Sequence, residues 1–160
     1  MLTDIDGIEV GNWTDPKAET GCTVVIFPEG TVASGEIRGG APATRDFALL
    51  DPSKLVDRID SVVLSGGSAF GLAACEGVIS YLEERGQGFP TASGNVPIVV
   101  GMSLFDLNQG DPLVRPGSQE GRKAAVEASS SQTMVGSVGA GTGATISKWR
   151  GRENAKSGGL

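Results

Sequence analysis

The sequence predicts an α+β fold in which residues 1–160 form a single domain. The length of 160 residues suits one domain. Short apolar runs rich in β-branched residues occur together with two longer amphipathic segments, which indicates strands mixed with helices. Glycine accounts for 25 residues, yet 39% of the chain is apolar, so the glycines favour tight turns in a folded protein over disorder.

The N-terminal part is predicted to consist of strands. Residues 8–13 alternate weakly and are interrupted by glycine, so they form a short strand at best. Residues 22–27 are β-branched and aromatic, end at Pro28 and predict a buried strand. The turn at Glu29-Gly30 then predicts a hairpin whose second arm covers residues 31–36.

A short helix, a strand and a long helix are expected next. Asp51-Pro52 combines an N-cap with a proline in the first turn, which predicts a helix over residues 52–59. Residues 61–64 form a brief apolar strand that leads into the turn SGGSAFG. A helix over residues 68–85 places one apolar stripe toward the core, made of Leu72, Cys75, Ile79 and Leu82.

The last third is predicted to add strands and one helix. Residues 97–100 and 103–105 are strand pieces, and residues 118–129 form a helix with two alanine pairs. The final candidate strand region, residues 134–149, is divided by four glycines.

Composition excludes several classes of function. A net charge of −6 provides no basic field for nucleic acid. The absence of histidine rules out a Ser-His-Asp or Cys-His couple within the chain and any His-ligated metal site. We therefore expect no metal and no cofactor.

Cysteine use and the N-terminus predict a cytoplasmic protein. The two cysteines form neither a CxxC pair nor a disulfide framework. The acidic N-terminus does not resemble a signal peptide, and no apolar run approaches the roughly 20 residues needed to span a bilayer, so no membrane association is expected.

The turn SGGSAFG is the sharpest local motif. Gly66 and Gly67 permit a tight turn, and the backbone N–H groups of a following helix suit an anion or a developing oxyanion. Ser68 has two interpretations. It is a candidate nucleophile that has no histidine to activate it, or, with more support, the N-cap of the helix.

The segment VGSVGAGTGAT, residues 135–145, is the second motif. A phosphate loop requires a glycine followed by lysine, but Thr142 follows Gly141, and the glycine spacing does not match a dinucleotide fingerprint. Two interpretations remain. Either glycines kink a strand so that another backbone packs against it, or they allow a ligand to approach.

Together the motifs resemble one family. GGAPATRD, LLDP, LSGGSAFGLAACEGV, YLEERGQGFP, VGAGTGAT and a closing GGL occur in the order found in the L-aminopeptidase/D-esterase family of DmpA-like and β-peptidyl aminopeptidases. The resemblance covers residues 7–160. It implies an αββα four-layer sandwich, shared with ornithine acetyltransferase, of which this chain supplies the N-terminal part.

The resemblance also implies a mechanism that needs no histidine. Family members are precursors that cleave themselves into α and β chains, and the new N-terminal Ser or Thr of the β chain is the nucleophile, with its own α-amine as base. In the family the nucleophile lies tens of residues beyond the GGL segment, so this chain resembles the α chain or a shortened piece of it. The expected partners are a β chain that carries the nucleophile, further αβ units in a homo-oligomer, and a small peptide or amide substrate.

Site residues are transferred from the family by position. Ser137 stands where several members carry an oxyanion-holding Asn, and a hydroxyl can donate one hydrogen bond. Phe105 aligns with a pocket Tyr and is expected to be a wall that cannot donate. The other expected substrate-binding residues are Gly66, Gly67, Ser68, Val138 and Gly139.

Two alternatives follow from the substitutions at Ser137 and Phe105 and from the shared fold. One is a non-catalytic binding or assembly protein that retains the fold. The other is an acyltransferase of the ornithine acetyltransferase type.

Overall fold

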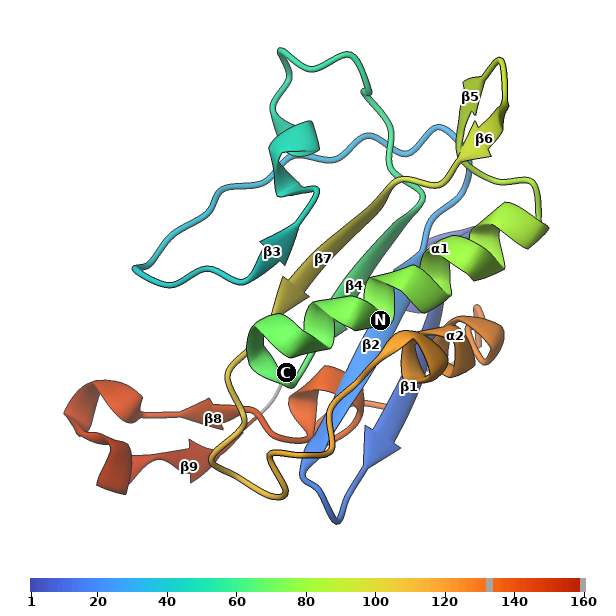
Figure 1. The fold of residues 1–160 in the computed structure, drawn as a ribbon. Helices are drawn as coiled ribbons and strands as arrows, with labels where there is room; N and C mark the ends of the chain where they lie inside the picture. The colour runs from blue at the N-terminus through green and yellow to red at the C-terminus, as the bar shows by residue number, and fades with distance from the viewer. Residues whose placement is uncertain (132–133, 159–160) are drawn as a thin grey trace.

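The structure is a computed structural model that describes residues 1–131 and 134–158. The last two residues of the closing Gly-Gly-Leu motif therefore lie outside the described residues. A five-stranded sheet forms the centre of the molecule (Figure 1). Its order is β1-β2-β4-β7-β3, formed by Glu9–Asp15, Thr20–Ile26, Ser61–Ser65, Val99–Ser103 and Thr44–Arg45.

Only one pair of neighbouring strands in this sheet is parallel. β4 and β7 run in the same direction, with Ser65 opposite Ser103 at their carboxyl ends, and the other neighbouring pairs are antiparallel. Loops that leave the carboxyl ends of two adjacent parallel strands emerge at the same edge of the sheet. The loop that begins at Gly66 and the loop that begins at Leu104 are therefore neighbours.

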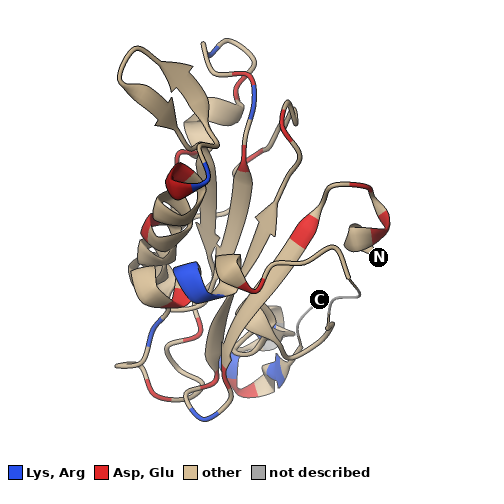
Figure 2. Cartoon of the chain, turned by 90° about the vertical axis from the view of Figure 1, so that its right-hand side faces the viewer, with Lys and Arg blue, Asp and Glu red and all other residues tan. Residues whose placement is uncertain are grey.

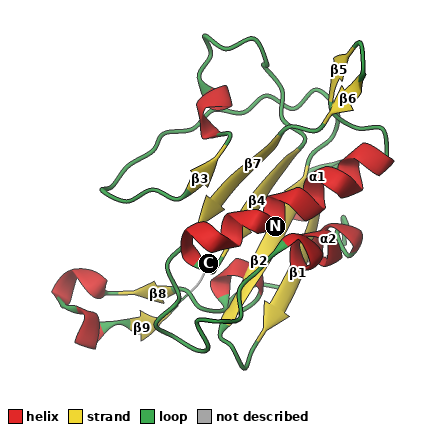
Figure 3. Cartoon of the chain, viewed as in Figure 1, coloured by secondary structure: helices red, strands yellow, loops and turns green. Residues whose placement is uncertain are grey.

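Two helices cover one face of the sheet (Figures 1 and 3). α1 spans Ala74–Glu84 and continues directly from the 3₁₀ turn η3, Ser68–Ala73, while α2 spans Ser118–Val126. Apolar side chains from the helices and strands form the main core. Its fully enclosed members include Cys22, Val24, Val63, Cys75, Val78, Leu82 and Val99.

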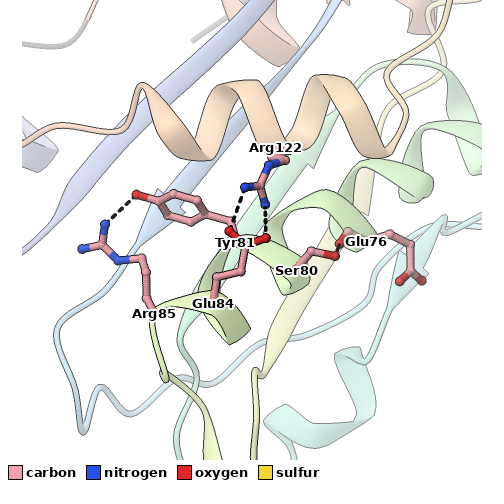
Figure 4. A network of polar contacts seen from close by, with 6 residues as sticks. All are labelled: Glu76, Ser80, Tyr81, Glu84, Arg85 and Arg122. Atoms are coloured by element: carbon pink, nitrogen blue, oxygen red, sulfur yellow. Dashed lines mark hydrogen bonds and ion pairs between the residues drawn. The ribbon is translucent and has the colours of Figure 1, made fainter.

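The two helices approach closely because each carries a glycine at the crossing. A Cβ atom at Gly77 of α1 would overlap the carbonyl oxygen of Ser118, and a Cβ atom at Gly121 of α2 would overlap that of Ala74. An ion pair on the outer side joins the same helices (Figure 4). The Arg122 guanidinium donates two hydrogen bonds to the Glu84 carboxylate, at 3.1 and 2.8 Å.

The opposite face of the sheet is only partly covered. A second apolar cluster, in which Leu50, Ile59, Ile98 and Val100 are buried, packs where the long segment between β2 and β4 crosses this face. The segment 134–144 crosses it elsewhere and contains the short 3₁₀ turn η4, Gly139–Gly141. Four further short strands form two hairpins at the periphery: β5 Phe89–Thr91 with β6 Gly94–Val96, and β8 Thr145–Ile146 with β9 Lys156–Ser157.

The mixed α and β composition is confirmed, and so are the principal elements. The predicted strands 22–27 and 61–64 are β2 and β4, and the predicted helix 118–129 is α2, which ends at Val126. The predicted helix 68–85 is present as η3 followed by α1. The weak strand at residues 8–13 is a full seven-residue strand, because every residue from Glu9 to Asp15 pairs with β2.

Four predictions of secondary structure were wrong. Residues 31–36 form no second hairpin arm, because both edges of β2 are already paired, one with β1 and one with β4. Residues 52–59 form no helix. The Asp51 carboxylate accepts a hydrogen bond from the Ser53 N–H, which closes a local turn, and Leu55 is 88% exposed, so no apolar stripe would hold a helix there.

The third concerns residues 134–149, which contain only the two-residue strand β8; η4 lies where a glycine-divided strand was expected. The two expected pieces at 97–100 and 103–105 are instead one continuous strand, β7.

Charged residues occur mainly outside the central strands of the sheet (Figure 2). The three central strands β2, β4 and β7 carry no charged residue. Among the described residues, no helix has the length and hydropathy that crossing a membrane requires.

Candidate functional site

A cavity of about 470 Å³ lies on the face of the sheet that α1 and α2 do not cover. Side chains alternate along a strand, so Val24 and Val63 face the helices while their neighbours face the cavity. Its floor is therefore mostly apolar and comes from Val10, Val25, Leu64 and Met102. The segment 134–144 forms its wall.

Both glycine motifs border this cavity. Ser65 lines it immediately before the Gly66-Gly67 turn, and Leu104 lines it immediately before Phe105. Gly136 and Val138, which flank Ser137, line the opposite wall. The structure thus places both glycine motifs beside this cavity. Of the predicted site residues, only Val138 lines it directly.

The Gly66-Gly67 turn has the left-handed backbone that its glycines predict. Gly67 has φ +81° and occupies the N-cap position of η3. Ser68 also has a positive φ, +55°, and is the first residue of η3, with no side chain capping it. The interpretation of Ser68 as an N-cap was therefore wrong, because Gly67 holds that position.

A buried carboxylate that sequence reasoning missed holds this turn. Asp106 is 3% exposed, and its Oδ1 accepts a hydrogen bond from the Gly67 N–H at 2.6 Å. Its Oδ2 accepts one from the Thr20 hydroxyl at 2.8 Å. A Cβ atom at Gly143 would lie 2.6 Å from the Cβ of Asp106, so the second glycine motif packs against the same side chain. Asp106 therefore links both motifs.

The second motif presents Ser137 at the surface and buries the residues after it. Ser137 is exposed, Val138 is half-buried and Gly139 is buried. The Val138 N–H donates to the Gly136 carbonyl at 2.9 Å, and the Gly139 N–H donates to the Thr14 hydroxyl at 2.8 Å. These two backbone donors are thus engaged within the chain, whereas the hydroxyl of Ser137 belongs to an exposed residue.

Phe105 extends from the loop after β7 and is 51% exposed. It does not line the cavity, although its neighbour Leu104 does. Its aromatic ring supplies apolar surface and no hydrogen-bond donor.

The two cysteines are inert components of the core. Burial is the main cause that raises the pKa of Cys22 to about 12 and that of Cys75 to about 11, with the nearby Arg45 partly opposing the rise at Cys75. Both thiols are free and uncharged at neutral pH. A thiolate nucleophile is therefore not available at either position.

Comparison with known proteins identifies the family. The sequence profile of Peptidase family S58 matches residues 1–153. An uncharacterised aminopeptidase of Mycobacterium leprae is 45% identical over 158 residues, which cover 89% of this chain and 44% of the relative. A 6-aminohexanoate-oligomer endohydrolase of Kocuria is 29% identical over 91% of this chain and 38% of that protein. The chain therefore spans less than half the length of these relatives.

The fold has a solved counterpart. The L-aminopeptidase D-Ala-esterase/amidase of Ochrobactrum anthropi, described as a variant of the Ntn hydrolase fold, superimposes with a TM-score of 0.69 at 18% identity. The match covers 89% of this chain and 43% of that one. Because the family profile spans nearly all of the sequence, this chain belongs to peptidase family S58, the family of the DmpA-type aminopeptidases.

Proposed function

We propose that this chain is the α portion of a self-processing N-terminal-nucleophile aminopeptidase or amidase that acts on small peptides, amides or esters. The observation that carries the proposal is the cavity, which both family motifs border on the one sheet face that the helices leave open. A β chain would supply the nucleophile, and αβ units would assemble into a homo-oligomer. The setting would be the reducing cytoplasm, consistent with two free thiols.

In this proposal the β chain adds a second sheet over the open face and completes the four-layer sandwich. Val10, Val25, Leu64 and Met102 form an apolar surface of the kind that packs against another sheet. We propose that the second sheet leaves a substrate pocket open beside Ser137, Phe105 and the Gly66-Gly67 turn. Residues 1–160 would then be a single structural unit of the larger protein.

The proposed chemistry is acyl transfer to a Ser or Thr. The hydroxyl oxygen of the β-chain N-terminal residue attacks the scissile carbonyl, and the α-amine of the same residue takes the hydroxyl proton. The tetrahedral intermediate carries a negative oxygen, to which the Ser137 hydroxyl donates a hydrogen bond. The intermediate collapses, the leaving amine takes the proton, and water then hydrolyses the acyl-enzyme.

The names of the relatives define the substrates to test. Alanine amides and esters suit the match from Ochrobactrum anthropi, and linear amides of 6-aminohexanoate suit the match from Kocuria. Both classes pair an amine with a short apolar acyl chain, which fits a cavity whose floor is mostly apolar. We propose that substrates of this shape bind with the apolar chain over β2 and β4.

Replacement of Ser137 by alanine tests the proposal. In the complete native gene product, with p-nitroanilides of L-alanine, D-alanine and β-alanine and with 6-aminohexanoate oligomers, we expect kcat to fall about 100-fold and KM to change little. Ser93→Ala is the matched control, since Ser93 lies exposed in the turn between β5 and β6. Unchanged kinetics for Ser137→Ala would contradict the oxyanion role, and failure of the unaltered protein to hydrolyse any of these compounds would favour a non-catalytic protein.

A further inference from the structure

Three polar side chains on β1 and β2 hold the second glycine motif from below. The Gly139 N–H donates to Thr14 Oγ1 at 2.8 Å, and the Ala140 N–H donates to Thr23 Oγ1 at 3.1 Å. The Thr23 hydroxyl in turn donates to Asn12 Oδ1 at 2.6 Å. We call Asn12, Thr14 and Thr23 the cradle.

The hydroxyl oxygens of Thr14 and Thr23 accept hydrogen bonds from the backbone of η4. A threonine hydroxyl rotates freely and can either donate or accept. Because the Thr23 hydroxyl donates its proton to Asn12 Oδ1, its oxygen acts as the acceptor for the Ala140 N–H. The first two N–H groups of η4, which have no partner within the turn itself, are thereby satisfied by side chains from two adjacent strands.

Gly139 fits this cradle because it has no side chain. Its φ of +54° is left-handed, and a Cβ atom would overlap Thr23 Oγ1 and Asn12 Oδ1. The Thr142 hydroxyl donates to the Gly139 carbonyl at 2.7 Å, so both backbone polar groups of Gly139 are hydrogen-bonded. Ser137 lies two residues before Gly139, between Gly136 and Val138, which line the cavity.

We propose that Thr14, Thr23 and Asn12 are positioning residues for the Ser137 hydroxyl in the hydrolytic reaction. The inference rests on the proposed function, in which Ser137 stabilises the oxyanion. The cradle acts through geometry: it fixes the turn to the rigid β1-β2 pair, so that the hydroxyl already stands where charge develops and need not be ordered during the reaction. Asn12 and Thr23 also line the cavity, so the test must separate positioning of Ser137 from direct contact with the substrate.

The test replaces Thr23 by a side chain of similar shape that lacks the hydroxyl. Thr23→Val in the complete native gene product is nearly isosteric and leaves the Ala140 N–H without its acceptor. We expect kcat to fall at least tenfold with KM changed less than twofold, and Thr23→Ser, which restores a hydroxyl, to recover most of the rate. Thr91→Val is the matched control, because the Thr91 hydroxyl also donates one hydrogen bond, to the Gly94 carbonyl, in the distant β5-β6 hairpin.

A double variant separates positioning from general destabilisation. If Thr23 acts through Ser137, then Thr23→Val should lower kcat little further in a Ser137→Ala background. The same fold-loss in both backgrounds, or no loss in either, would overturn the cradle proposal while leaving the proposed function intact. No loss from Ser137→Ala alone would instead overturn the proposed function.

Folding is monitored in the same experiment. Thermal unfolding midpoints are measured for each variant, and Thr14→Val provides a second route that removes the Gly139 acceptor. A lowered kcat in a variant that keeps a native midpoint supports positioning. If both valine variants failed to fold, the cradle would be a folding element only, and the proposal would be overturned.

Discussion

The Asp106 carboxylate accepts a hydrogen bond from the backbone N–H of Gly67 at 2.6 Å, across 39 positions of sequence. This contact joins the loop after β7 to the loop after β4, at the edge where the two parallel strands end. A second bond, from the Thr20 hydroxyl at 2.8 Å, ties the same carboxylate to the start of β2. One buried side chain thus fixes three segments that meet beside the cavity.

Replacement of Asp106 by alanine should therefore destabilise the protein by about 3 kcal/mol, because two hydrogen bonds to a buried charged group are lost and the Gly67 N–H keeps no partner. Asp106→Asn keeps one acceptor oxygen and should cost about 1 kcal/mol. Urea unfolding measures both values, and Asp57→Ala, at an exposed loop position, is the control. Equal stability of the alanine variant and the unaltered protein would contradict this role.

Gly139→Ala should lower the free energy of unfolding by at least about 3 kcal/mol, since it combines a left-handed backbone with a steric clash. Gly30→Ala isolates the backbone contribution, because Gly30 has φ +85° and nothing lies within 4 Å of an added Cβ atom. We expect this variant to lose about 1 kcal/mol of unfolding free energy. Gly40→Ala has neither feature and should be neutral. Chemical denaturation of the three variants checks this order, and a Gly139→Ala variant as stable as Gly30→Ala would refute the close fit.

A larger side chain at the crossing of α1 and α2 should destabilise the protein. Gly121→Ala improves helix propensity by up to about 1 kcal/mol, yet its methyl group overlaps the Ala74 carbonyl, so we expect a net loss of about 2 kcal/mol. Ser80→Ala, on the exposed side of α1 in Figure 4, should be neutral or slightly stabilising. Thermal unfolding distinguishes them, and a stabilised Gly121→Ala would mean that the helices are farther apart than described.

The cysteines should not react in the folded protein. With pKa values of about 12 for Cys22 and about 11 for Cys75, both thiols stay protonated at pH 8, well below either pKa, and both are buried. Ellman's reagent at pH 8 should label neither cysteine natively and both in guanidinium, where the pKa returns to about 8.5. Rapid native labelling, or loss of hydrolysis after alkylation of the folded protein, would show that a thiol is accessible.

The parts of the fold that could be predicted are those whose signal is local. β2 and β4 are runs of β-branched apolar residues, and α1 carries a continuous apolar stripe, so each reveals its own structure. The failures involve pairing. Residues 31–36 have strand-like composition, but β1 and β4 already occupy both edges of β2.

In the candidate site, too, the sequence revealed the local features and not the partners that are remote in sequence. Glycine clusters at residues 66–67 and 136–143 were visible because glycine is needed at left-handed positions such as Gly67 and Gly139. The residues that hold these turns were missed, because their partners are remote in sequence. Thr14 bonds a residue 125 positions away, and Thr23 one that is 117 away. Nothing local distinguishes such threonines from ordinary strand residues.

The most direct test of the central claim is the intact mass of the natively expressed protein under denaturing conditions, with N-terminal sequencing of every polypeptide present. Our account predicts two polypeptides, one that contains residues 1–160 and a second that begins with Ser or Thr. The second polypeptide would carry the nucleophile that the histidine-free α portion requires. A single unprocessed polypeptide in a preparation that hydrolyses the alanine or 6-aminohexanoate amides would contradict the account.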